Sequence, residues 1–169
     1  PDSSYFWVEF NDHRAQMYGR DGNAIGTQLN DVGYIYIAPD SSYFWVEFND
    51  HRAQMYDRDG NLIGPELTGV DEFNDQFNIK ISPDSSYSWV TFEDVKAQMY
   101  GRDGVPIGPE LNNEDSFFDY FRINISPDSS YSWVSAGDNN HYRAQMYDRD
   151  GNLIGPELTH VSYIRIAPD

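Results

Sequence analysis

The chain has 169 residues, no cysteine and a formal net charge of −17. This length can bury one substantial core, whereas the lack of cysteine excludes disulfides and thiolate metal sites. The acidic balance argues against a nucleic-acid partner, because phosphate binding needs clustered Lys and Arg. No apolar run approaches the roughly 18 residues that suggest a membrane span. The first residue is Pro instead of Met, which is typical of a trimmed or mature fragment, so we assign no compartment.

One segment recurs four times along the chain, at intervals of about 42 residues. The predicted repeats cover residues 1–38, 39–82, 83–126 and 127–167. Residues 1–18 and 39–56 are identical, which indicates recent duplication or engineering. A single repeat is too short to bury a core of its own, so neighbouring repeats must stack. We therefore predict a single domain over residues 1–169.

Each repeat reads as four short strands joined by turns. For the second repeat, the first predicted strand is Tyr34–Ile37, at the end of the preceding repeat, and the others are Tyr43–Val46, Arg52–Tyr56 and Leu62–Leu67. The first alternates Ile with polar or aromatic residues, and the second is rich in aromatic and β-branched residues. A Pro-Asp-Ser-Ser turn joins the first two strands, and an Arg-Asp-Gly hairpin joins the last two.

Proline places the fourth strand in the sheet. Pro65 cannot donate to a neighbouring strand, so its strand is predicted at a sheet edge. No segment has apolar residues at helical spacing over three turns. Four antiparallel strands repeated at this interval predict an all-β fold, a β-propeller with four blades per chain.

Two motifs resemble a known family. Ile81–Tyr87, which precedes a strand, and the hairpin Tyr100–Gly104 are similar to the WD-repeat-like blades of TolB-type propellers. This chain departs from that pattern in having Ser where the family usually has Gly, and in lacking a Trp-Asp dipeptide. The resemblance covers nearly the whole chain, implies the propeller fold and carries no catalytic residue with it.

The last strand predicted, Tyr163–Ala167, has no repeat after it, whereas residues 5–29 lack a first strand. We predict that it completes this first blade and so removes an open edge. It can do so within one chain, which gives a four-bladed ring. It can also do so between two chains, which gives an eight-bladed homodimer. We favour the homodimer slightly over the closed monomer.

All differences in length between repeats fall in connections predicted at one face. The connections Leu67–Ile79 and Leu111–Ile123 are longer than Leu29–Ile35, and Trp133–Arg143 is longer than Trp45–Arg52. Variable loops on a rigid scaffold often bind partners. The candidate ligand- or partner-binding residues are Asp71, Glu72, Phe73, Asp75, Glu114, Asp115, Phe117, Phe118, Asp119, Tyr120, His141 and Tyr142. They suit a sugar, a basic partner or a hard cation. Alternatively, the Phe side chains cap the blade ends while the acids stay solvated.

Three further patterns have a structural interpretation that we prefer. Asp57-x-Asp59-x-Asn61 opens like a calcium loop, but it lacks the later Gly and Glu, so a hairpin turn is predicted. The three histidines at the second turn are interpreted as polar turn residues rather than metal ligands; they are His13, His51 and His141. The repeated Tyr and Trp of the second strand could stack on sugars, but packing between blades is predicted.

No nucleophile, base and orienting group come together in the sequence, and no phosphate-binding glycine loop precedes a helix. We therefore predict no catalytic residues, no metal and no cofactor. The predicted function is a non-enzymatic repeat scaffold or protein-interaction module. The alternative is a repeat lectin that binds carbohydrate through aromatic residues.

Overall fold

The computed structural model describes residues 5–70, 78–93, 96–112, 121–137 and 142–167. Fifteen strands and no helix occur in these ranges. Accordingly, the described part of the chain contains no helix that could cross a membrane.

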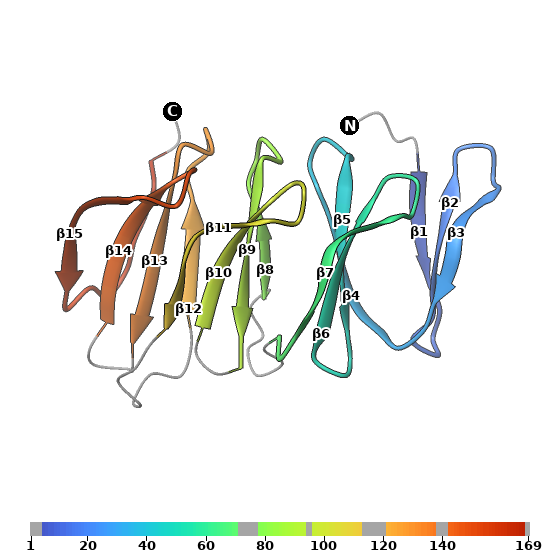
Figure 1. Cartoon of the computed structure of the whole chain (residues 1–169), viewed down its shortest axis with the longest axis horizontal. Coiled ribbons are helices and arrows are strands. Elements are labelled where there is room, and N and C mark those ends of the chain that lie inside the picture. Colours follow the sequence, from blue (N-terminus) through green and yellow to red (C-terminus); the bar gives the residue numbers. More distant parts are fainter. Residues whose placement is uncertain (1–4, 71–77, 94–95, 113–120, 138–141, 168–169) are drawn as a thin grey trace.

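The strands form four antiparallel sheets in chain order (Figure 1). The first sheet has three strands, β1 (Tyr5–Glu9), β2 (Ala15–Gly19) and β3 (Ala24–Leu29). The second has β4 (Val32–Ile37), β5 (Tyr43–Phe48), β6 (Arg52–Asp57) and β7 (Leu62–Thr68). The third has β8 (Ile79–Ile81), β9 (Tyr87–Phe92), β10 (Lys96–Gly101) and β11 (Pro106–Asn112). The fourth has β12 (Phe121–Ile125), β13 (Tyr131–Gly137), β14 (Tyr142–Asp148) and β15 (Leu153–Thr159).

The position of Pro65 confirms the predicted edge strand. β7 is the last strand of its sheet, so the missing N–H of Pro65 interrupts no pairing on its outer side. The register between β6 and β7 shifts between Ala53 and Met55, so β7 has a bulge in which residues 64–66 lie opposite Gln54. Gly64 has a φ of 65°, a conformation that side-chain-bearing residues rarely adopt.

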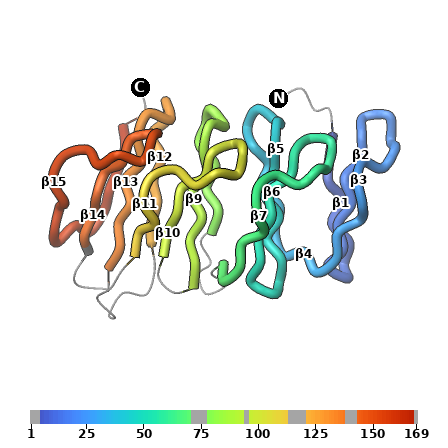
Figure 2. The backbone as a smooth tube through the Cα atoms, viewed as in Figure 1, coloured from blue at the N-terminus to red at the C-terminus, as the bar shows by residue number. Residues whose placement is uncertain are grey.

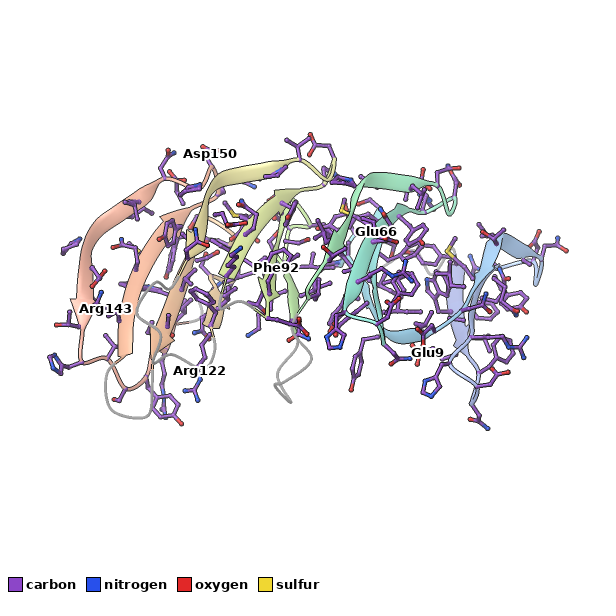
Figure 3. All side chains as sticks on the ribbon, turned by 60° about the horizontal axis from the view of Figure 1, so that its bottom comes forward. Glu9, Glu66, Phe92, Arg122, Arg143 and Asp150 are labelled. Carbon is purple, nitrogen blue, oxygen red and sulfur yellow. The ribbon has the colours of Figure 1, made fainter. Side chains whose placement is uncertain are left out.

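The four sheets stand side by side in a row, with the first and fourth sheets at opposite ends (Figures 1 and 2), and the turned view shows that the row curves into an open arc (Figure 3). The hydrophobic core lies between successive sheets, in three separate clusters. Trp45 and Trp89, each 1% exposed, fill the second and third of these interfaces. The predicted packing of this Trp between blades is therefore confirmed in the middle of the chain.

A serine from the next sheet satisfies the polar atoms of these aromatic residues. The Trp45 indole N–H donates to Ser88 Oγ at 3.1 Å, and the Tyr43 hydroxyl hydrogen-bonds the same oxygen at 3.0 Å. Tyr87 and Trp89 use Ser132 in the same way. The first interface differs because Phe44 takes the place of this serine, and the buried Nε1 of Trp7 has no hydrogen-bond partner among the described residues.

Serine also explains a departure from the resembled family. Ser85, in the turn before β9, has a φ of 61°, which normally favours glycine. Its hydroxyl is fully buried and accepts the backbone N–H of Asp40, in the preceding sheet, at 3.0 Å. Ser129 accepts the N–H of Asp84 in the same way. The hydrogen bond between sheets offsets the backbone strain and ties each turn to its neighbour.

The C-terminal segment differs from the sequence prediction. Residues 161–167 form no strand, and the first sheet has three strands. The segment lies in a groove beside β8 and β12, where Ile164 and Ile166 contribute to the lining. The segment lies away from β1, which is at the other end of the row of sheets (Figure 1). Completion of the first blade by this segment stays a prediction.

Candidate functional site

Antiparallel pairing divides the ends of the sheets into two faces. The long-loop face contains the described strand ends Glu9, Leu29, Phe48, Thr68, Phe92, Asn112 and Gly137. The short-turn face contains the turns at residues 20–23, 38–42, 58–61, 82–86, 102–105, 126–130 and 149–152. These faces are the lower and upper edges of the molecule in Figure 1. The strand ends that flank every connection of variable length lie at one face, as predicted.

The candidate binding residues lie mostly outside the described residues. They are Asp71, Glu72, Phe73, Asp75, Glu114, Asp115, Phe117, Phe118, Asp119, Tyr120 and His141. Tyr142 is the first residue of β14, at the long-loop face. The structure does describe the positions at which these loops join the sheets.

Next to these strand ends, cationic residues are held by local partners. Arg52 stacks over the Phe48 ring at 4.9 Å and donates to Asp50 at 2.7 Å and to Glu66 at 2.6 Å. The first sheet repeats the arrangement with Arg14 over Phe10. The labelled side chains of Glu9, Arg122 and Arg143 lie along this edge, whereas Asp150 lies at the opposite edge (Figure 3).

The short-turn face uses its own polar groups to join the sheets. The guanidinium of Arg102 donates to Asp40 at 3.0 Å and to Ser42 at 2.8 Å, in the preceding sheet. Arg149 makes the same contacts with Asp84 and Ser86. Turns of constant length are needed here because each one must meet the turn of its neighbour.

The carboxylate of Asp84 gives this face a dependence on pH. Burial disfavours its charged form, but hydrogen bonds from Ser86 and Ser82 outweigh this effect and lower the pKa to about 2, from 3.8. The ionised group therefore stabilises the folded state above about pH 4, and this contribution is lost as the pH falls from about 4 to about 2. The slope of the free energy of unfolding against pH reflects the difference in bound protons between the unfolded and folded states. We expect the Asp84→Asn variant to reduce this difference by about one proton in this pH range. Urea midpoints measured at a series of acidic pH values test this, and an unchanged slope would contradict it.

The calcium-like motif is a hairpin turn, as predicted. The Asp57 carboxylate accepts the backbone N–H groups of Asp59 and Asn61 and the Asn61 side-chain amide, at 2.8–2.9 Å. In the fourth sheet, hydrogen bonds from Asn152 lower the pKa of Asp148 in the same geometry. Each carboxylate thus stabilises its own turn, and among the described residues no group of three His, Asp or Glu side chains is arranged to hold a metal.

The two described histidines of the second turn are turn residues, as predicted. His13 and His51 have φ values of 61° and 65° in the β1–β2 and β5–β6 turns. His51 Nδ1 also contacts the Glu93 carboxylate of the next sheet. His141 lies outside the described residues.

An inner groove with cationic residues was not identified from the sequence. It has a volume of about 750 Å³ and runs along β8, β12 and the C-terminal segment. Lys80 and Arg165 line it, and Arg122 lines an adjoining pocket of about 220 Å³. Lys80 Nζ donates to the Ile123 carbonyl at 2.8 Å, and burial lowers the pKa of Lys80. One feature of the sequence could have indicated this groove. The residue between the two Ile of the first strand is cationic in two of the four repeats, although the chain is acidic overall.

A buried glutamate links the second and third sheets. Glu47 is 6% exposed and accepts hydrogen bonds from the Tyr36 hydroxyl at 2.7 Å and the Asn78 amide at 3.0 Å. Burial, followed by the charge of Glu47, raises the pKa of Tyr36. Tyr36 therefore remains a hydrogen-bond donor to Glu47.

The comparisons with known proteins identify the fold and no family. No family model matches the chain, and no curated protein matches it in sequence. Among solved structures it is similar to the dihydro-heme d1 dehydrogenase NirN in complex with DHE, a propeller-like protein, with a TM-score of 0.62 and 15% identity. The match covers 94% of this chain and 35% of that chain.

The chain has a β-propeller-like fold. Its four sheets superpose on about a third of the longer protein, which is consistent with the open arc of Figure 1. At this identity the similarity extends to the fold alone.

Proposed function

We propose that this protein is a non-enzymatic scaffold that binds a protein partner through its long-loop face. The observation that carries the proposal is the difference between the two faces. On the short-turn face, Arg102 and Arg149 are occupied in contacts between sheets. Every connection that varies in length joins strands at the other face, where loops can change without disturbing the packing.

We also propose that the blades are related to the WD-repeat-like blades of TolB-type propellers. The support is the pair of turn motifs, Ile81–Tyr87 and Tyr100–Gly104, which recur along the sequence with only small changes. The serine at position 85 is compatible with this relationship, because its hydrogen bond to Asp40 offsets the conformation that glycine adopts freely.

A repeat lectin remains the alternative, but the repeated aromatic residues give it little support. Tyr43, Trp45, Tyr87 and Trp89 are each 1% exposed. In the two middle sheets these rings are therefore covered by protein and cannot stack on a sugar. A lectin would have to use the aromatic residues of the long loops instead.

Exchanging the loops tests the proposed face. Both long connections, Leu67–Ile79 and Leu111–Ile123, are replaced by the short form of Leu29–Ile35. A displayed peptide library and a glycan array are then applied in parallel to the native chain and the variant. We expect folding to be kept, because the short form already joins two sheets in this chain, and binding of selected peptides to be lost.

The matched control changes the other face, by the exposed substitution Asp59→Ser in the β6–β7 turn. We expect this variant to keep peptide binding. Peptides that bind the loop-exchanged chain as well as the native one would refute the proposed face. Selective glycan binding that disappears with the loops would instead support the lectin.

A further inference from the structure

The outer face of the fourth sheet repeats a surface that is buried elsewhere in the molecule. Tyr131, Trp133 and Met146 on this face are only half-buried. Their counterparts in the second sheet, Tyr43, Trp45 and Met55, are at most 1% exposed, because the third sheet covers them. The fourth sheet therefore ends the arc with a partly exposed aromatic face. The equivalent face of the second sheet is buried against the sheet that follows it.

The first sheet presents the complementary surface at the other end. Phe6 is 49% exposed and stacks on Tyr18 at 5.7 Å. In the second sheet the same pair, Phe44 and Tyr56, stacks at 5.3 Å, but there Phe44 is fully buried. The sequences of residues 1–18 and 39–56 are identical, so the two surfaces are chemically the same. The Trp7 ring covers Phe44 edge-on, with 4.9 Å between the ring centroids. In the fourth sheet, Trp133 is equivalent to Trp7.

Contacts between glycines also differ between the interior of the arc and its two ends. Between successive sheets a glycine of the outer strand meets a glycine of the next hairpin, in the pairs Gly26–Gly60, Gly64–Gly104 and Gly108–Gly151. A Cβ added at Gly104 or Gly151 would lie 2.8 or 2.6 Å from the Cα of the opposing glycine. By contrast, Gly155 and Gly22, at the two ends, have nothing described within 4 Å. They are the outer-strand half and the hairpin half of one more such pair.

Charged residues repeat the pattern on the short-turn face. Arg102 and Arg149 each bind an aspartate in the turn of the preceding sheet, namely Asp40 and Asp84. Arg20 is the equivalent arginine of the first sheet, and the structure gives it no partner among the described residues. Asp128 is the equivalent aspartate of the fourth sheet; it accepts hydrogen bonds from Ser130 but from no described arginine.

The C-terminal segment matches the strand that the first sheet lacks. In the second sheet Tyr36 lies opposite Trp45, and its hydroxyl donates to Glu47. With the same register, Arg165 of the segment would lie opposite Trp7 and beside Glu9, which occupies the position of Glu47 and is exposed. A segment paired with β1 in this register would place an opposite charge at the position where the second sheet has a hydrogen bond.

We propose that a second copy of this chain covers the exposed faces of the first and fourth sheets, and that two copies form one closed ring. The fourth sheet of each copy packs on the first sheet of the other, and residues 163–167 leave the groove to become the fourth strand of that sheet. The first and fourth sheets lie at opposite ends of the arc (Figure 1). One chain could join them only by increasing the angle between successive sheets, which would separate the glycine pairs. Two head-to-tail junctions related by a two-fold axis satisfy both ends without this change.

Light scattering and native mass spectrometry of the whole chain test the closed pair. We expect a mass twice the 19.5 kDa of one chain, constant at all concentrations well above the dissociation constant of the dimer. A mass of one chain at all concentrations overturns the proposal. So does a mass that keeps growing with concentration, because that is the behaviour of an open polymer.

Charge reversal tests which surfaces meet. Arg20→Glu and Asp128→Arg each place like charges together at both junctions, and we expect each to weaken the dimer by at least about tenfold. The double variant exchanges the charges and should restore much of the affinity. A dimer that tolerates both single variants uses another surface, and the proposal is then wrong.

A glycine variant keeps the test valid if Asp128→Arg disturbs its own turn. Gly155→Asn keeps a residue type that tolerates the φ of 68°, but it adds a side chain where the hairpin of the second copy would approach. Gly69→Asn is the matched control, because Gly69 has a φ of 71° and open space but lies on the long-loop face. We expect only Gly155→Asn to produce monomers. Equal dimerisation of the two variants counts against the proposed junction.

Discussion

Replacement of Trp45 by Ala should lower the free energy of unfolding by about 3–5 kcal/mol, a large part of the stability of a small domain. Trp45 fills the interface between the second and third sheets, with 1% of its surface exposed. Its ring meets Tyr100 edge-on, with 5.8 Å between centroids, and its N–H donates to Ser88. The substitution leaves a cavity between two rigid sheets, which cannot move together without disturbing the turns that join them.

Trp133→Ala is the matched control, because Trp133 occupies the same position in the fourth sheet but is only half-buried. Both variants can be unfolded in urea at a concentration low enough for the chains to be monomeric. We expect Trp133→Ala to cost roughly half as much as Trp45→Ala, since less apolar surface is lost from the core. Equal losses in dilute solution would show that burial between sheets is not what stabilises this position.

Ser88→Ala should cost about 2–4 kcal/mol, although it removes a single oxygen atom. That oxygen serves two buried groups, the Tyr43 hydroxyl at 3.0 Å and the Trp45 N–H at 3.1 Å. Neither group is reached by water, since Tyr43 and Trp45 are 1% exposed and Ser88 is fully buried. The remaining acceptor near Tyr43 is the Tyr87 carbonyl, at 3.5 Å, which is too distant to replace the lost hydrogen bond fully.

A double-mutant cycle with Tyr43→Phe separates this cause from a general packing defect. In the native background Tyr43→Phe removes a hydrogen bond and should cost about 1 kcal/mol. In the Ser88→Ala background it removes an unpaired hydroxyl and should cost almost nothing. Urea unfolding of the four proteins gives the coupling energy, and strictly additive losses would contradict the shared role of Ser88.

These effects depend on contacts between repeats, for which the sequence contains only indirect signals. The Tyr and Trp of the second strand were identified as packing residues, but Ser88 and Ser132 were not identified as their partners. Each serine lies more than forty residues away in the chain, and a serine in a strand has no distinctive pattern. The inner groove of Lys80 and Arg165 went unrecognised for the same reason, because it forms only where several sheets meet.

The sequence by itself determined the elements and their order. The repeat interval, the Pro-Asp-Ser-Ser and Arg-Asp-Gly turns and the edge position of Pro65 are local features, because backbone preferences act within a few residues. They also determined that all variable connections join one face, since antiparallel strands alternate in direction. The candidate residues on those connections remain predictions from the sequence, apart from the placement of Tyr142 at the start of β14.

Only the tertiary structure decided where the sheets meet and where they do not. It left Tyr163–Ala167 unpaired, because β1 lies at the far end of the arc. It also buried Phe44 and exposed Phe6, although both residues stand in identical sequences. The physical reason is that a side chain is buried only when a second surface covers it. The sequence of a strand determines which side chains it presents, but only the neighbouring sheet determines whether water can reach them.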